Sequence, residues 1–376
     1  MPFPKPESKV HQMKCPVCGT DNPAESLFCS RCTSPVSVVA LGELTDADRR
    51  LSLAALLKTL APIVEREPKN FPTSWPAYLS AFWLRPETAL ILAGECDTIN
   101  KVSSPGPWLD LGCGDGVHAA LYSNWKFARS FDVFQSLDPT AGDIYNRFDP
   151  KSFHVEVIER GRKIDFGIDI KPTAVERARA LKVFESVMQA DATKLPIKDD
   201  SIGTIFSNML RDLDDPLPSA LNECRRVLRR DGRLLLSTMT PAYADSLYFA
   251  PQAREAEQRS DSKRAKQLLK LDRGRSVFCR SQRDLDAWKK LLDNAGLKLL
   301  DTIPIVGSEV INFWDIGLRP FTSPLLARLE SWRANDSIES IKTASLELLH
   351  QLIDGLASDL TRGETCMQML VIGRAR

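Results

Sequence analysis

The 376-residue sequence has almost no net charge and no long apolar run. Its 50 lysines and arginines balance 49 acids, so the overall charge favours neither nucleic acid nor an anionic membrane as a partner. No stretch approaches the roughly 18 uncharged apolar residues that a spanning helix needs. The first 14 residues carry three prolines and no apolar run, so we expect a disordered tail and no signal peptide. These absences predict a soluble, cytoplasmic protein.

The length predicts about two domains, and a hydrophobic content of 43% provides enough side chains for a large core. The composition of the chain, and the positions at which proline and glycine interrupt it, change along the sequence. We expect five segments: a tail with a cysteine cluster at 1–36, a helical connector at 37–107, an α/β core at 108–306 with an insertion at 125–163, a helical insertion or lid at 307–363, and a last core strand at 364–376.

Short apolar runs alternate with helical patterns from Trp108 onward, which is typical of a doubly wound α/β fold with a largely parallel sheet. Helices are predicted between the runs, at 119–124, 173–181 and 218–228. We expect a Rossmann-like sheet of seven strands. The predicted strands are 108–111, 164–168, 186–189, 202–207, 233–238, 298–306 and 367–372.

The first of these strands ends in the stretch WLDLGCGDG, which contains Gly112, Gly114 and Gly116. Glycines at a spacing of two let the backbone approach a ligand closely, and the following helix offers free N–H groups. The pattern is GxGxG, whereas the dinucleotide fingerprint is GxGxxG. This difference favours S-adenosylmethionine over NAD.

Three acids, Asp110, Asp169 and Asp191, stand at or directly after the ends of successive predicted strands. Ligands of doubly wound folds bind at the carboxyl ends of the strands. An adenosyl cofactor presents two ribose hydroxyls, an exocyclic amine and a cationic sulfonium, all of which a carboxylate can satisfy.

The chain resembles the class I S-adenosylmethionine-dependent methyltransferases, in particular the branch with ubiquinone/menaquinone-type and other small-molecule enzymes. The resemblance covers about 108–306 and 367–375. It is carried by LDLGCGDG, FGIDIKPTAVERAR, MQADATKLPIKDDSIGTIFSNML and LNECRRVLRRDGRLLLST. It implies that Asp169 binds the ribose and Asp191 the adenine amino group. The remaining implied cofactor contacts are Asp110, Gly112, Gly114, Gly116, Ile170, Ala192 and Ser207.

The sequence departs from the family pattern in one spacing. The ribose acid of the family lies roughly 20 residues past the glycine loop, as in dinucleotide folds, but Asp169 lies 53 residues beyond Gly116. Asp138 lies 22 residues beyond it and is the rival candidate. We prefer Asp169 because its strand leads directly into a helix and then to Asp191. Residues 125–163 then form an insertion rich in aromatic residues, either a lid over the substrate mouth or a packed decoration.

The acceptor is expected beyond the fourth strand, where Asn208, Arg211 and Asp212 are the polar candidates and the first two are preferred for catalysis. His118, after the glycine loop, is a candidate base. SNML is not the Asn/Asp-Pro-Pro-aromatic box of base-modifying enzymes. We therefore favour a small or carrier-linked acceptor, such as a sugar-like intermediate. The alternatives are an rRNA or tRNA methyltransferase and a non-catalytic scaffold that binds S-adenosylmethionine.

Two basic runs bear on these alternatives. Residues 254–275 predict a solvated helix or a basic flap over an anionic acceptor. The arginines at 225, 226, 229 and 230 predict an exposed helix face.

Cysteines cluster near the N-terminus with the spacing of a metal site. Two CxxC pairs supply four thiolates, which predicts a tetrahedral structural Zn(II) centre. The segment resembles short prokaryotic zinc ribbons and, through Asn22, the Ran-binding-protein type of finger. It is expected to cap the fold or contact a protein, with RNA recognition as the alternative; 307–363 could also form a homodimer contact. The predicted metal ligands are Cys15, Cys18, Cys29 and Cys32.

Overall fold

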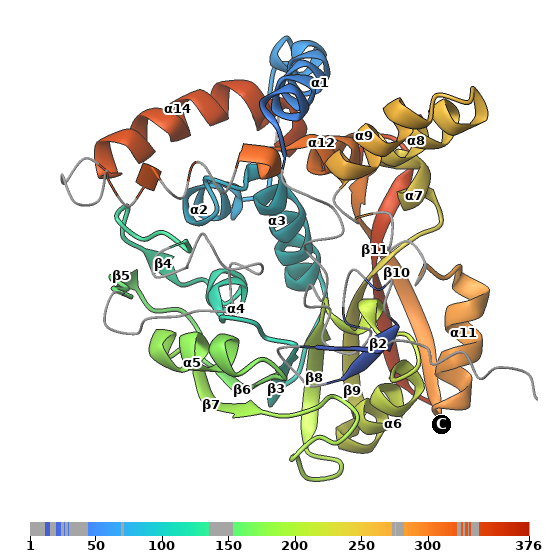
Figure 1. Ribbon diagram of the computed structural model, residues 1–376. Helices are drawn as coiled ribbons and strands as arrows, with labels where there is room; N and C mark the ends of the chain where they lie inside the picture. The colour runs from blue at the N-terminus through green and yellow to red at the C-terminus, as the bar shows by residue number, and fades with distance from the viewer. Residues whose placement is uncertain are drawn as a thin grey trace, which may run out of the picture.

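The computed structural model describes residues 12–15, 20–23, 26, 29, 44–68, 71–134, 153–272, 275, 282–321, 325, 328, 329, 331 and 338–375. Most of this chain forms one α/β body around a central sheet, with a layer of helices above the carboxyl ends of its parallel strands (Figure 1). None of the described helices combines the length and apolar character needed to cross a membrane.

The central sheet has seven strands in the order β10-β11-β9-β8-β3-β6-β7. The five strands from β9 to β7 pair in parallel, whereas β11 runs antiparallel to both β9 and β10. The sheet strands are β3 (Trp108–Leu111), β6 (Ile164–Asp169), β7 (Phe184–Gln189), β8 (Ile202–Ser207), β9 (Leu228–Met239), β10 (Leu297–Gly307) and β11 (Thr365–Arg374).

Helices cover both faces of this sheet, so the central strands are buried throughout. Successive residues of a strand point to opposite faces. Ile205 therefore joins a core with Leu221 and Trp288 on one face, while Phe206 joins the larger core on the other face. Cover on both faces explains why β3 and β8 are mostly apolar and show no alternation of polar and apolar residues.

The helices that flank the sheet or extend it are short and well delimited. Two of them, α5 (Pro172–Leu181) and α6 (Leu217–Val227), carry proline in the first turn, where its missing N–H leaves no helical hydrogen bond unmade. The helices around the sheet are α4 (Val117–Tyr122), α5 (Pro172–Leu181), α6 (Leu217–Val227), α11 (Leu285–Asn294) and the 3-10 helix η2 (Leu210–Asp212).

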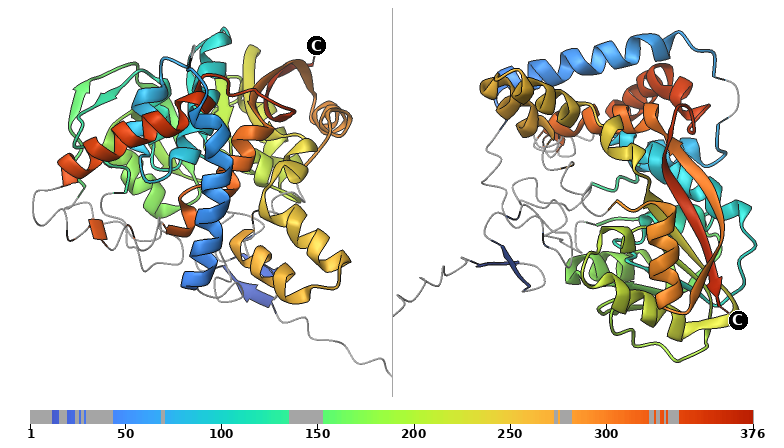
Figure 2. Two further views of the ribbon diagram at one scale, coloured as in Figure 1. Left: turned by 90° about the horizontal axis from the view of Figure 1, so that it is seen from above. Right: turned by 90° about the vertical axis from the view of Figure 1, so that its right-hand side faces the viewer.

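A second group of helices forms the layer above the sheet, where α1 contacts both α12 and α14 (Figure 2). A capping box between Thr45 and Asp48 starts α1, and Asp48 also accepts a hydrogen bond from Lys270 of α9. The members are α1 (Asp46–Val64), α2 (Trp75–Ala81), α3 (Pro86–Lys101), α7 (Ala242–Ser246), α8 (Phe249–Gln258), α9 (Ser262–Asp272), α12 (Ser308–Ile316), η4 (Arg319–Phe321) and α14 (Ile338–Ala357).

Two small antiparallel pairs complete the described structure: β1 (Gln12–Lys14) with β2 (Asp21–Pro23), and β4 (Lys126–Phe127) with β5 (Val157–Glu159). The predicted α/β class with a seven-stranded sheet is confirmed. The prediction of an exposed helix face at residues 225–230 is wrong in two respects. Helix α6 ends at Val227, so Arg229 and Arg230 belong to β9, and Arg226 is bonded to a loop.

Candidate functional site

A cavity of about 370 Å³ opens where β3, β6, β7 and β8 end, a size that suits a small-molecule ligand. Ten of the twelve residues predicted to bind cofactor or act in catalysis line this cavity, while Gly116 and Arg211 do not. The ten are Asp110, Gly112, Gly114, His118, Asp169, Ile170, Asp191, Ala192, Ser207 and Asn208.

The three glycines after β3 all have positive φ angles but differ in their surroundings. A Cβ on Gly112 would lie 2.7 Å from Met209, and one on Gly116 would lie 3.1 Å from the Phe184 ring. A Cβ on Gly114 would meet nothing within 4 Å. Gly112 and Gly116 thus serve close packing, whereas Gly114 leaves open space at the cavity wall.

Asp169 joins the end of β6 to the glycine loop. Its carboxylate accepts hydrogen bonds from the backbone N–H of Gly114 at 2.9 Å and of Lys171 at 2.8 Å. Burial raises the pKa of Asp169, although these two hydrogen bonds and the charge of Lys171 oppose the rise. The rival ribose acid, Asp138, lies outside the described residues.

Asp110 is the most strongly perturbed acid that lines the cavity. Burial raises its pKa to about 7, against the hydrogen bond that it accepts from the Tyr122 hydroxyl at 2.8 Å. The nearby charge of Asp169 adds to the rise. A carboxyl group with such a pKa changes its charge near neutral pH.

Asp191 begins the loop between β7 and β8. Its carboxylate accepts a hydrogen bond from the backbone N–H of Thr193 at 2.9 Å, and its carbonyl accepts one from Lys194. The preceding residue, Ala190, donates its N–H to the carbonyl of Asp169 at 3.1 Å. The two predicted cofactor acids are therefore held next to each other by backbone contacts.

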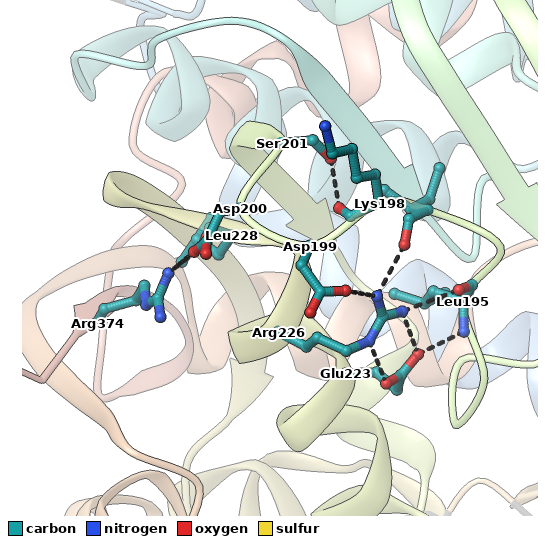
Figure 3. A network of polar contacts seen from close by, with 10 residues as sticks. Leu195, Lys198, Asp199, Asp200, Ser201, Glu223, Arg226, Leu228 and Arg374 are labelled. Carbon is teal, nitrogen blue, oxygen red and sulfur yellow. Dashed lines mark hydrogen bonds and ion pairs between the residues drawn. The ribbon is translucent and has the colours of Figure 1, made fainter.

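The remainder of this loop is bonded to α6 (Figure 3). Arg226 makes a two-point contact with Glu223, in which Nε–Oε1 and Nη2–Oε2 both measure 2.7 Å. It also donates to the carbonyls of Leu195 and Ile197 and to Asp199, while Glu223 accepts from the Leu195 N–H. The guanidinium lowers the pKa of Glu223. This network fixes the loop that carries Asp191.

The three candidates for catalysis converge on a residue that sequence reasoning missed, Glu95 of α3. Asn208 Nδ2 donates to this carboxylate at 3.0 Å and Arg211 Nη1 at 3.3 Å, and His118 Nε2 lies 3.3 Å from it. The Tyr78 hydroxyl lies 2.8 Å from His118 Nδ1. A lone acid in the apolar run ILAGEC was the available signal.

The described part of the 125–163 insertion is packed against the body. Arg177 of α5, fully buried, donates to the Val133 carbonyl at 2.7 Å and lies over the Phe153 ring. Arg177 also lies 3.5 Å from Asp115 of the glycine loop. On the opposite side, the buried Lys342 of α14 donates to the Arg129 carbonyl at 2.9 Å.

Two of the four predicted metal ligands belong to the described residues. Cys15 and Cys29 are both buried, and the Cys15 N–H donates to the Thr20 carbonyl beside the β1–β2 pair. Cys18 and Cys32 lie outside the described residues. Within the described ranges no group of three or more potential metal ligands occurs.

Parts of the chain are similar to known methyltransferases. Residues 151–236 match the family profile described as a methyltransferase domain. A malonyl-[acyl-carrier protein] O-methyltransferase of Methylococcus capsulatus is 44% identical over 63 residues, which are 17% of this chain and 23% of the relative. A protein of Mycobacterium tuberculosis, named a probable S-adenosylmethionine-dependent methyltransferase, is 30% identical over 118 residues, which are 31% of this chain and 43% of the relative.

The chain thus spans less than half the length of these curated relatives. Among solved structures, an S-adenosylmethionine-dependent methyltransferase from Mesorhizobium loti is 13% identical, covering 77% of this chain and 100% of its own, with a TM-score of 0.39.

Proposed function

We propose that this chain, which carries a class I S-adenosylmethionine-dependent methyltransferase domain, transfers a methyl group to a small or carrier-linked acceptor. The observation that carries the proposal is the placement of Asp110, Asp169 and Asp191 around one cavity with the glycine loop. These groups come from three different strand ends, so their convergence is a property of the fold and not of one local motif.

The cavity residues fit an adenosyl cofactor. Gly114 leaves open space at the wall, where a side chain would fill the cradle. Asp169 and Asp191 would hold the ribose hydroxyls and the adenine amine, with Ile170 and Ala192 beside them. Asp110 would face the cationic part of the cofactor. When bound, S-adenosylmethionine supplies a methyl group already activated on a sulfonium, so the chain mainly has to align the acceptor with it.

The acceptor end of the cavity combines apolar walls with few polar groups. Phe82, Leu92 and Phe206, which belong to one hydrophobic cluster, line the cavity together with Asn208. Such a wall suits an acceptor with an extended apolar part. The malonyl-[acyl-carrier protein] O-methyltransferases among the relatives support a carrier-linked acceptor, and a sugar-like acceptor is the other small-molecule option.

The test is methyl transfer from S-adenosylmethionine labelled in the methyl group. The purified chain would be incubated separately with malonyl-loaded acyl-carrier protein, a small-metabolite fraction and total RNA, with Asp169→Ala as the inactive control. We expect label in a carrier or metabolite fraction with the wild type alone. Label in none of the three fractions would contradict the proposal, and label in RNA would favour the rRNA or tRNA alternative.

Three described basic residues of 254–275 have acidic partners, whereas Lys263 and Lys266 of α9 are exposed. Arg254 pairs with Asp245, Arg259 pairs with Glu255, and Lys270 pairs with Asp48 of α1. A phosphate-binding surface needs cations that face solvent without such partners. The run forms parts of two helices, α8 and α9, which each bury one face, and we favour solvated outer faces over a phosphate-binding flap.

The four-cysteine zinc ribbon remains part of the proposal. Buried thiols at Cys15 and Cys29, next to a short β-hairpin, support a closed Zn(II) site completed by Cys18 and Cys32. Metal analysis of the full chain should give one zinc per chain, and the double variant Cys15→Ser/Cys29→Ser should give none. A wild-type chain without zinc would contradict the ribbon. Light scattering on the same samples would test for a homodimer.

A further inference from the structure

Glu95 lies in the middle of α3, between Gly94 and Cys96, and has no exposed surface. A carboxylate taken out of water is strongly destabilising unless it is paired and hydrogen-bonded. A buried acid in an apolar helix face therefore requires partners. Here the partners come from three elements that surround the acceptor end of the cavity.

Every contact of the Glu95 carboxylate involves a residue near the cavity. Oε1 accepts hydrogen bonds from the Ser237 hydroxyl at 2.6 Å and from Arg211 at 3.3 Å. Oε2 accepts from Asn208 Nδ2 at 3.0 Å and lies 3.3 Å from His118 Nε2. Arg211 also donates to Ser237 at 2.8 Å, which closes the cluster.

These contacts keep the acid ionised. Burial alone would raise the pKa of Glu95, but the neighbouring His118 ring, the charge of Arg211 and the Ser237 hydroxyl lower it to about 2. The group is thus a fixed negative charge at neutral pH.

The contacts also decide which atoms Asn208 and His118 can present. The Asn208 amide directs its NH₂ group to Glu95, which leaves its carbonyl oxygen as the group available to the cavity that it lines. Both ring nitrogens of His118 have buried neighbours, Nε2 the Glu95 carboxylate and Nδ1 the Tyr78 hydroxyl. The His118 ring is thus held between Glu95 and Tyr78.

We propose that Glu95 is a positioning residue for methyl transfer, which orients Asn208 and His118 at the acceptor end and has no part in holding the cofactor. This inference rests on the proposed function. Its consequence is a separation of effects: loss of the Glu95 charge lowers kcat and leaves the affinity for S-adenosylmethionine largely intact, because Asp169 and Asp191 are untouched.

The chain offers a matched control. Glu87 is a second fully buried glutamate on the same helix, but it pairs with Arg85 at 2.9 Å and accepts from the Leu318 N–H. Glu95→Gln and Glu87→Gln therefore remove the same group from the same helix, and only the first change reaches Asn208 and His118. Glu95→Asp keeps the charge and serves if Glu95→Gln does not fold.

The experiment measures three quantities on each variant after its thermal unfolding is recorded. For Glu95→Gln we expect S-adenosylmethionine affinity within about threefold of wild type, a fall in kcat of roughly 30-fold, and partial recovery in Glu95→Asp. For Glu87→Gln we expect kcat within about threefold. Equal kcat losses in both variants, or none in Glu95→Gln, would overturn the inference.

A readout without turnover separates this inference from the proposed function. The sequence has four histidines, so selective ¹⁵N labelling gives a readable spectrum, with His118 assigned by its loss in His118→Gln. The ring nitrogen shifts of His118 should change in Glu95→Gln and stay unchanged in Glu87→Gln. If the wild type transfers no methyl group, the proposed function fails. The shifts still decide whether Glu95 orients the His118 ring. Unchanged ring nitrogen shifts of His118 in Glu95→Gln would refute the inference that Glu95 orients His118.

Discussion

The two ends of the cavity are built in different ways. The cofactor end comes from strand ends and their loops between Trp108 and Ser207, and most of its contacts involve backbone N–H and carbonyl groups. The acceptor end depends on side chains from distant elements: Glu95 reaches Asn208 across 113 positions and Ser237 across 142. Local motifs can mark the parts of the first arrangement, because each part stands at or just after the end of a strand. The second arrangement is a product of tertiary packing.

The largest expected effect tests how tightly the cofactor end is packed. Gly112→Ala should lower the free energy of unfolding by about 3 kcal/mol, because left-handed backbone strain adds to a collision with Met209. Gly114→Ala introduces the backbone strain without a collision and should lower the free energy of unfolding by about 1–2 kcal/mol. Its new methyl group should also weaken cofactor binding. Chemical denaturation and calorimetry would measure both. Equal destabilisation would contradict the different roles assigned to the two glycines.

The kcat loss in Glu95→Gln is the next effect in size, and it tests the acceptor end. Its comparison with Glu87→Gln sharpens the contrast between the two ends, since a purely structural role for buried acids of α3 predicts the same result for both variants. A loss of cofactor affinity in Glu95→Gln would contradict the distinction between the cofactor end and the acceptor end.

Removing the Arg226 guanidinium should affect the cofactor end through its loop. Arg226→Met leaves Glu223 and two carbonyls without their donor, so we expect a loss of about 2 kcal/mol in the free energy of unfolding. A severalfold weaker cofactor affinity should accompany it, because the loop carries Asp191. Arg230→Met, at an exposed position of β9, should change neither value. Thermal unfolding of both variants would measure the stability, and calorimetry would measure the cofactor affinity. Equal losses in the two variants would contradict the prediction.

The last effect is a pH dependence at Asp110. Its carboxyl keeps a proton up to about pH 7 in the folded chain but releases it near pH 3.8 when unfolded. Stability should therefore fall as pH rises through this window, by up to about 1.4 kcal/mol per pH unit, and level off above pH 7. Asp110→Asn should show a flatter profile in denaturation series from pH 5 to pH 8. Identical slopes would show that Asp110 is not the group that titrates.

The fold and the cofactor end could be predicted from the sequence to a large degree, because apolar runs, glycine spacing and strand-end acids are local signals. The contacts between distant elements could not be predicted. The basic pattern of α6 gave no indication that Arg226 would bind the Leu195 and Ile197 carbonyls, because its partners belong to another loop. Likewise, Glu95 resembles any helical acid until α3 is packed against Ser237 and Asn208.

The central claim is that Asp169 anchors the adenosyl cofactor at the end of β6, and calorimetry of S-adenosylmethionine binding to Asp169→Ala tests it most directly. Hydrogen bonds to a charged group contribute about 1.5–3 kcal/mol each, so two ribose contacts predict a loss of roughly 100-fold or more. Asp200→Ala, at an exposed acid that pairs with Arg374, is the control and should bind like the wild type. Unchanged affinity in a folded Asp169→Ala chain would contradict the account and transfer the ribose role to Asp138 or another acid.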